Sequence, residues 1–257
     1  MFTVDDGYFD FADVAAPIFA AYDCPVSVFL ITDFIDGKLW NWFDRVGWAI
    51  RTSKLTEIAF HIDGDAVAIQ LHSAAARSAS EERLVERLKL MPDAEKERSI
   101  ARLVEGLEVS LPQNAPARDR AMTWDDVRRC AKSGATFGPH TVTHPVLSRV
   151  DTARADREIC ESWTRVLNET DAAVPVFCYP NGTPRDFSQR DKAIVAQAGM
   201  KAALSTVEAP IVVRNSRLDA QDPFALPRFA YPETLPALVQ MVSGLAAMRS
   251  RLMGRLA

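Results

Sequence analysis

The stretch FTVDDGY, residues 2–8, decides the fold and raises the first question about function. Two apolar side chains, Phe2 and Val4, alternate along a short strand that ends in the adjacent acids Asp5 and Asp6. Neighbouring carboxylates repel each other, and charge at the end of a buried strand is costly. A chain that keeps this pair must therefore hold something nearby that compensates for the two charges.

The residues around this stretch predict parallel strands that alternate with helices. Residues 11–22 carry apolar side chains at helical spacing, and PVSVFLI (25–31) is a β-branched, nearly all-apolar run that predicts a buried strand. Strand, helix and strand in so short a span form a βαβ unit, whose strands are parallel. The same rhythm resumes after residue 120, with Thr123 as an N-cap, Asp126 three residues later and Gly134 past the helix end. Further strands are predicted at 135–141, 174–180 and 201–205.

Residues 37–120 interrupt this rhythm. KLWNWFDRVGWAIR predicts an aromatic-rich helix, in which packing is favoured over a sugar-stacking platform because large aromatic side chains mainly bury. Apolar residues then alternate on both sides of an Asp-Gly pair at 63–64, which indicates a hairpin, and two charged helices follow at about 80–91 and 93–110. We interpret the block as a helical and hairpin insertion, or lid, on a single α/β domain that spans 1–257.

Composition narrows the class of protein. The chain has 257 residues, which is within the usual length of an α/β barrel, and 48% of them are hydrophobic, which is enough for a full core. Its formal net charge is −4. Lys and Arg are scattered, so no nucleic-acid partner is expected. No signal peptide or membrane-spanning run is visible, which favours the cytoplasm; a truncated N-terminus is the alternative. The four cysteines form no Cys-x-x-Cys pair and are expected to be thiols: Cys24, Cys130, Cys160 and Cys178.

The last segment, residues 234–257, predicts an amphipathic C-terminal helix with three arginines near its end. Docking of this helix against the barrel is the favoured interpretation, because arginines suit a helix C-terminus. Weak contact with a membrane surface is the alternative.

A second polar cluster, GPHTVTHPVLS (138–148), follows another predicted strand. Its two histidines, His140 and His144, are four residues apart and can converge on one cation. Both clusters lie at the C-terminal ends of predicted parallel strands, where barrel active sites lie. Two histidines and one carboxylate form a three-ligand metal site with open positions, and the second acid is free to act as a general base. A cation in this place would also explain the acidic pair.

Three motifs in this order, TVDDGY, HTVTHP and FCYPNG, resemble those of the polysaccharide deacetylase (NodB homology) family, over roughly residues 2–210. The resemblance implies a distorted (β/α) barrel and metal-dependent hydrolysis of an N-acetyl group from an amino sugar, with Zn²⁺ or another divalent metal as cofactor. By motif position, Asp5 would be the general base, and Asp6, His140 and His144 the metal ligands. The resemblance makes the Asn181 backbone N–H an oxyanion donor and places Thr141, Thr143, Tyr179 and Arg228 among the substrate-binding residues.

The sequence departs from the family in its third and last motifs. The family usually has an arginine in the third motif that orients the base, and Cys178 stands there instead; Arg228 or Arg185 could replace it. The family's last motif supplies a histidine as general acid, whereas no histidine follows His144 here. Some members carry that histidine on an extra N-terminal strand, so a truncated N-terminus would account for the loss. His61 and His72 are interpreted as ordinary residues of the hairpin region.

The expected function is hydrolysis of an N-acetylated carbohydrate by a metal-dependent enzyme. A vestigial domain that holds metal but turns over slowly is the alternative, because a lost general acid typically costs about 10²–10⁴ in rate. Another linear amide substrate, such as a formylated amino sugar or a ureido compound, is the third interpretation.

Overall fold

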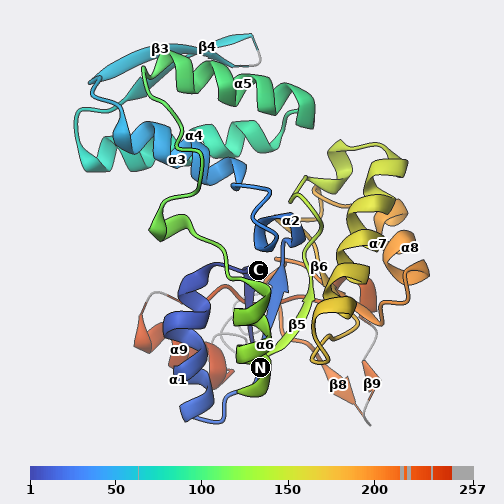
Figure 1. Cartoon of the computed structure of the whole chain (residues 1–257). Coiled ribbons are helices and arrows are strands. Elements are labelled where there is room, and N and C mark those ends of the chain that lie inside the picture. The colour runs from blue at the N-terminus through green and yellow to red at the C-terminus, as the bar shows by residue number, and fades with distance from the viewer. Residues whose placement is uncertain (63, 215–216, 219–220, 233, 245–257) are drawn as a thin grey trace, which may run out of the picture.

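The computed structural model describes residues 1–62, 64–214, 217–218, 221–232 and 234–244. A parallel sheet in the order β1-β2-β5 forms its centre (Figure 1). The middle strand is buried at every position because helices cover both faces of the sheet, as its apolar sequence VSVFL predicts. A second pair of parallel strands, β6-β7, follows in the fold. A single parallel bridge between Phe137 of β5 and Ala173, just before β6, connects it to the central sheet. The parallel strands are β1 (Phe2–Asp6), β2 (Val26–Leu30), β5 (Thr136–Pro139), β6 (Val176–Cys178) and β7 (Ala202–Leu204).

Helices flank these strands on two sides, with α1 and α6 on one and α7 and α8 on the other (Figure 1). The predicted capping box of α6 is confirmed: the Thr123 hydroxyl accepts from the Asp126 N–H, and the Asp126 carboxylate accepts from the Thr123 N–H. The predicted helix over 11–22 forms as a π-helical turn, η1, followed by α1. These elements are η1 (Phe11–Ala15), α1 (Ala16–Ala21), α2 (Thr32–Ile35), η2 (Ala117–Asp119), α6 (Trp124–Lys132), η3 (Leu147–Arg149), α7 (Thr152–Glu169), α8 (Gln189–Gln197) and η4 (Pro223–Ala225).

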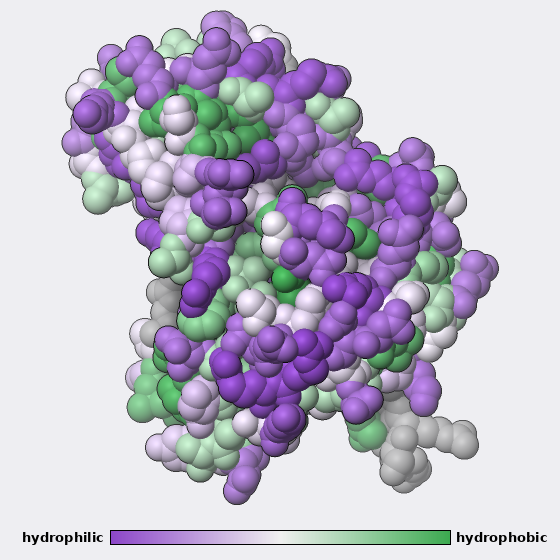
Figure 2. All heavy atoms as spheres, in the orientation of Figure 1, coloured by the Kyte–Doolittle hydropathy of each residue, from purple (hydrophilic) through white to green (hydrophobic). Residues whose placement is uncertain are grey.

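The segment between α2 and η2 forms a separate layer beside the strand ends, at the top of Figure 1. Its helices and hairpin share a hydrophobic cluster of their own, centred on Trp42, Ile69 and Leu103. The predicted helix at 80–91 begins earlier, because the Ser73 hydroxyl caps it by accepting from the Ala76 N–H. Figure 2 shows a mostly hydrophilic face with one hydrophobic patch on this layer. Its elements are α3 (Trp42–Thr52), β3 (Glu57–Ile62), β4 (Asp65–Gln70), α4 (Ala74–Lys89) and α5 (Asp93–Gly106).

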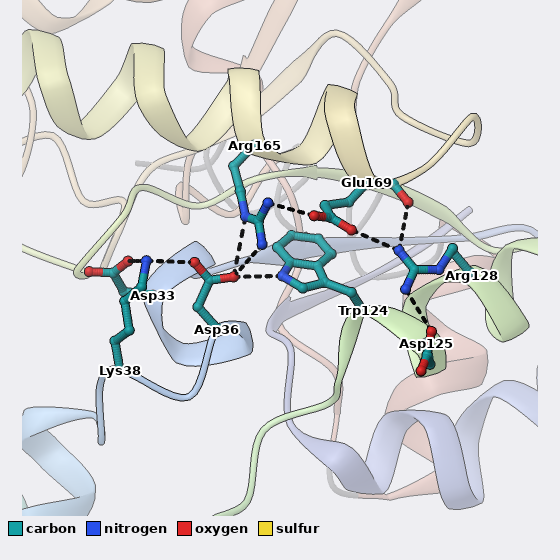
Figure 3. Close-up of polar contacts among 8 residues, drawn as sticks. All are labelled: Asp33, Asp36, Lys38, Trp124, Asp125, Arg128, Arg165 and Glu169. Carbon is teal, nitrogen blue, oxygen red and sulfur yellow. Dashed lines mark hydrogen bonds and ion pairs between the residues drawn. The ribbon is translucent and has the colours of Figure 1, made fainter.

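A partly buried carboxylate joins the end of α2 to α6 and α7 (Figure 3). Asp36 accepts from Trp124 Nε1 at 2.7 Å and from Arg165 Nη2 at 2.8 Å. Arg165 also pairs with Glu169, which in turn pairs with Arg128 of α6. Three helices that are far apart in the sequence are therefore fixed around one side chain.

The last described elements are the small hairpin β8 (Val213–Arg214) and β9 (Arg217–Leu218) and the helix α9 (Leu235–Val242). The predicted C-terminal helix over 234–257 begins as expected, with Thr234 as its N-cap, but ends at Val242. Gly244 has a positive φ of 74°, which suits the end of a helix. Residues 245–257 of that prediction lie outside the described residues. Among the described residues, no helix is both long and apolar enough to cross a membrane.

Candidate active site

The sheet brings the two polar clusters together at one edge. Asp6 ends β1, His140 directly follows β5, and both strands pair in parallel with β2, so their ends meet. Asp6 Oδ1 lies 3.4 Å from His140 Nε2 and 3.6 Å from His144 Nε2. The three side chains predicted as metal ligands therefore converge on one point.

Unusual backbone conformations concentrate at this point. Among the described residues, six other than glycine have positive φ, and four of them are Asp6 (72°), Thr141 (69°), His144 (57°) and Asn181 (60°). Such conformations cost about 1–3 kcal/mol each and persist only where the surroundings enforce them. No sequence pattern indicated this strain.

The loop that carries both histidines is anchored by a residue that sequence reasoning missed. Glu158 of α7 is buried and accepts from the N–H groups of Val142 (2.9 Å) and Thr143 (2.8 Å). It also accepts from the Thr143 hydroxyl, while the Thr141 hydroxyl accepts from the His144 N–H at 3.0 Å. Both threonine hydroxyls therefore hold the loop, and the substrate-binding roles predicted for them stay predictions. An acid on the apolar face of α7 was the available signal for Glu158.

The donor set fits a divalent cation. Burial, with the charges of Asp5 and Asp44, raises the pKa of Asp6 to about 8, although the positive charge of Arg228 opposes this shift. A bound cation would favour the ionised form of this carboxylate. Burial lowers the pKa of both histidines, so their rings are neutral, which is the form that binds metal. His140 Nδ1 lies 2.7 Å from the Cys178 carbonyl oxygen, a contact that directs Nε2 towards Asp6. One carboxylate and two imidazoles suit Zn²⁺ and related divalent metals.

The neighbouring acid, Asp5, is held in a different way. Arg228 donates to Asp5 Oδ1 at 2.8 Å and to Oδ2 at 2.5 Å, a two-point ion pair. Burial opposes ionisation of Asp5, but the Arg228 hydrogen bonds and nearby positive charge hold its pKa below the ordinary value. Asp5 is therefore held in its ionised form, which is the form that a general base requires. Arg228 also lines the cleft that opens over these residues, so the substrate contact predicted for it stays a prediction beside this observed ion pair with Asp5.

Cys178 lies beside the same carboxylate, with Sγ 3.6 Å from Asp5 Oδ1. Asp5, His140 and Cys178 could also group around a metal. This second set is the weaker one, because Arg228 occupies both Asp5 oxygens and burial raises the pKa of the thiol well above its ordinary value. His140 thus serves the set that contains Asp6.

A cleft of about 550 Å³ opens over these residues. The strand ends supply one wall, and α3 and α4 of the neighbouring layer supply the other. Asn181 lines the cleft, and within the described residues its backbone N–H has no hydrogen-bond acceptor, so it is free to meet a developing oxyanion. The Phe43 ring packs edge-on against His144, at 5.5 Å between centroids, and also lines the cleft.

Other candidates lie away from the cleft. The Tyr179 hydroxyl donates to the Phe224 carbonyl, and its ring stacks on Phe187 at 3.9 Å in the core. Tyr179 does not line the cleft, and nothing in the described part of the structure supports the substrate contact predicted for it. Arg185 is exposed and does not line the cleft, so of the two arginines only Arg228 reaches the base. His61 and His72 are exposed and lie outside the lining of the cleft.

Comparison with known proteins concerns the chain as a whole and its fold. The model of the polysaccharide deacetylase family matches residues 1–203. No curated protein sequence matches the chain. The fold is similar to that of the Streptococcus pyogenes deacetylase PplD in complex with acetate, with a TM-score of 0.53, 17% identity, and coverage of 93% of this chain and 67% of that one. It is also similar to the BpsB deacetylase domain from Bordetella bronchiseptica, with a TM-score of 0.50, 15% identity, and coverage of 88% and 69%.

Proposed function

The chain belongs to the polysaccharide deacetylase family, and from this premise we propose that it removes N-acetyl groups from an amino-sugar oligo- or polysaccharide with the help of a divalent metal. Membership in the family makes the chain a carbohydrate deacetylase; the metal and the acetamido sugar are the proposed part. One observation carries the proposal: Asp6 Oδ1 lies 3.4 Å from His140 Nε2 and 3.6 Å from His144 Nε2. These three side chains and the Asp5 carboxylate line the same open cleft.

Asp6, His140 and His144 would hold the metal. A bound divalent cation polarises a carbonyl oxygen and lowers the pKa of water from 15.7 towards ~7. Asp5 takes a proton from the attacking water. Its hydrogen bonds from Arg228 keep the carboxylate ionised and fix the position of both carboxylate oxygens. The Asn181 N–H donates to the oxygen that becomes negative, an interaction typically worth about 10²–10³ in rate. The carbon–nitrogen bond then breaks, and acetate and the amine leave.

Metal content and acetate release test this proposal together. Purified chain would be loaded with zinc, assayed for bound metal, and incubated with a panel of N-acetylglucosamine oligomers. We expect stoichiometric metal and acetate release in the wild type. His144→Ala should lose both metal and turnover, whereas Asp5→Asn should keep the metal and lose turnover.

The exposed His72 provides the matched control, since His72→Ala should retain metal and turnover. Metal without acetate from any oligomer would contradict the enzymatic role and favour a vestigial domain. Acetate release that survives loss of the metal would contradict the assignment of the ligands.

A further inference from the structure

Cleavage of an amide requires a proton donor for the departing nitrogen, because a free amide anion is a very poor leaving group. Asp6 and both histidines in the lining of the cleft belong to the proposed metal set, and Asp5 is the proposed base. Among the described residues, the other lining residues of the cleft are the candidates for this donor. Among them, the side chains that can carry a transferable proton are Asp44, Glu81, Glu82 and Lys89.

Three of these four are either paired with a charged neighbour or exposed to solvent. Glu81 is paired with Arg51 at 3.4 Å, and Lys89 is paired with Glu86 at 2.7 Å. Glu82 is exposed to solvent. Asp44, in contrast, is partly buried in the first turn of α3, directly after the ring of Phe43 that packs on His144.

The Asp44 carboxyl group is held in a fixed position. The Tyr8 hydroxyl donates to Asp44 Oδ2 at 2.6 Å, and Asn41 Nδ2 donates to the same hydroxyl oxygen at 3.0 Å. Tyr8 follows the acidic pair by two residues, so this chain of contacts ties the wall of the cleft to the end of β1. Burial raises the pKa of Asp44 to about 6, with Asp119 and Arg51 as the charged neighbours.

We propose that Asp44 is the general acid of the proposed deacetylase and donates a proton to the amine nitrogen as the carbon–nitrogen bond breaks. The inference rests on the proposed function and names a catalytic residue that the family motifs do not contain. Asp5 and Asp44 enter the cleft from β1 and from α3, so base and acid come from different walls.

The proposed step balances. Water adds its oxygen to the carbonyl carbon and gives one proton to Asp5. The electron pair of the carbon–nitrogen bond goes to nitrogen, which takes the proton of the Asp44 carboxyl group. The acetyl group leaves as acetic acid with the oxygen and the second proton of the water, and it releases that proton to solvent to become acetate. The proton on Asp5 returns through solvent to restore Asp44.

Dependence on the leaving group tests the assignment. Zinc-loaded wild type and Asp44→Asn would be compared on an N-acetylglucosamine oligomer and on 4-nitrophenyl acetate, whose phenolate leaves without a proton. We expect the amide kcat to fall about 10²–10⁴-fold in Asp44→Asn. The ester rate and the zinc content should stay close to wild type, and Asp44→Glu, which keeps a carboxyl group, should recover part of the amide rate.

Glu82→Gln removes a rival acid on the same wall and should show no selective loss on the amide. Equal losses on both substrates in Asp44→Asn, or no loss on the amide, would overturn the assignment. A wild type that cleaves the ester but no amide would instead overturn the proposed function itself, so the two failures can be told apart.

Discussion

Arg228 donates hydrogen bonds to both carboxylate oxygens of Asp5, at 2.8 Å and 2.5 Å, although the two residues are 223 positions apart in the sequence. A planar guanidinium is suited to this two-point contact, which fixes the direction of the carboxylate as well as its charge. The position where the resemblance implied an arginine holds Cys178, a buried thiol in contact with the same carboxylate. Asp5, the proposed base, is thus oriented from the segment that follows η4.

Replacement of this arginine should impair turnover more than metal binding. In Arg228→Met, Asp5 loses both hydrogen bonds and its fixed direction, and we expect kcat to fall about 10²-fold, as for a misplaced catalytic group. Zinc content should not change, because Asp6, His140 and His144 are untouched. Steady-state kinetics on an acetylated oligomer, with metal analysis, would check this. Arg185→Met, on an exposed arginine, is the control, and an unchanged kcat in Arg228→Met would contradict the role.

Removal of Glu158 should loosen the histidine loop. Glu158→Ala deletes three hydrogen bonds to one carboxylate, and we expect a loss of about 2–3 kcal/mol in the free energy of unfolding. Zinc affinity should fall as well, by about 10–100-fold, because the loop positions His144. Urea unfolding and zinc titration measure the two effects. Glu161→Ala changes an exposed acid on the same helix and should have little effect; equal zinc affinity in both variants would refute the coupling.

Close strand packing beside the site should make Gly138 intolerant of a side chain. A Cβ at this position would meet the Val176 carbonyl oxygen at 2.5 Å and the Phe29 ring at 2.7 Å. Gly138→Ala should therefore destabilise the fold by about 1–3 kcal/mol. In Gly106→Ala the new Cβ meets only Ile58 at 3.9 Å, so this helix variant should be neutral or stabilised by up to about 1 kcal/mol. Thermal unfolding of both variants checks the contrast in sign, and similar melting temperatures would argue against it.

Acid should weaken the network in Figure 3 through Asp36, whose side chain is 10% exposed. Although burial opposes ionisation, hydrogen bonds from Lys38, Trp124 and Arg165 lower the pKa of Asp36 from 3.8 to about 2. A carboxylate with a lowered pKa stabilises the fold fully above about pH 4 and loses that contribution as the pH falls through 2.

The variant Asp36→Asn should therefore be less stable than wild type by about 1–2 kcal/mol at neutral pH, and the difference should shrink below pH 4. Urea unfolding at pH 7, 4 and 2.5 measures this difference. Asp125→Asn, at a side chain that is 89% exposed, should show little change at any of these values. A gap between wild type and Asp36→Asn that stays constant with pH would rule out the ionisation as its source.

Much of the framework could be predicted because its signals are local. The all-apolar run of β2 requires burial on both faces, and the Thr123–Asp126 capping box involves residues only three apart. The convergence of Asp6 with His140 also followed from sequence, since ends of parallel strands meet at one edge. The boundaries of α4 and α9 were less accurate, because the Ser73 cap and the end at Val242 depend on single residues.

The sequence by itself therefore determined the parallel strands, the edge at which the polar clusters meet, and the three side chains that converge there. Only the tertiary structure decided which residues serve that edge from a distance: Arg228 on the base, Glu158 beneath the histidine loop and Asp44 across the cleft. The physical reason is the separation along the chain between the residues that interact. Strand patterns and caps arise from neighbours in the chain, whereas ion pairs and buried hydrogen bonds depend on where distant segments are brought together by packing.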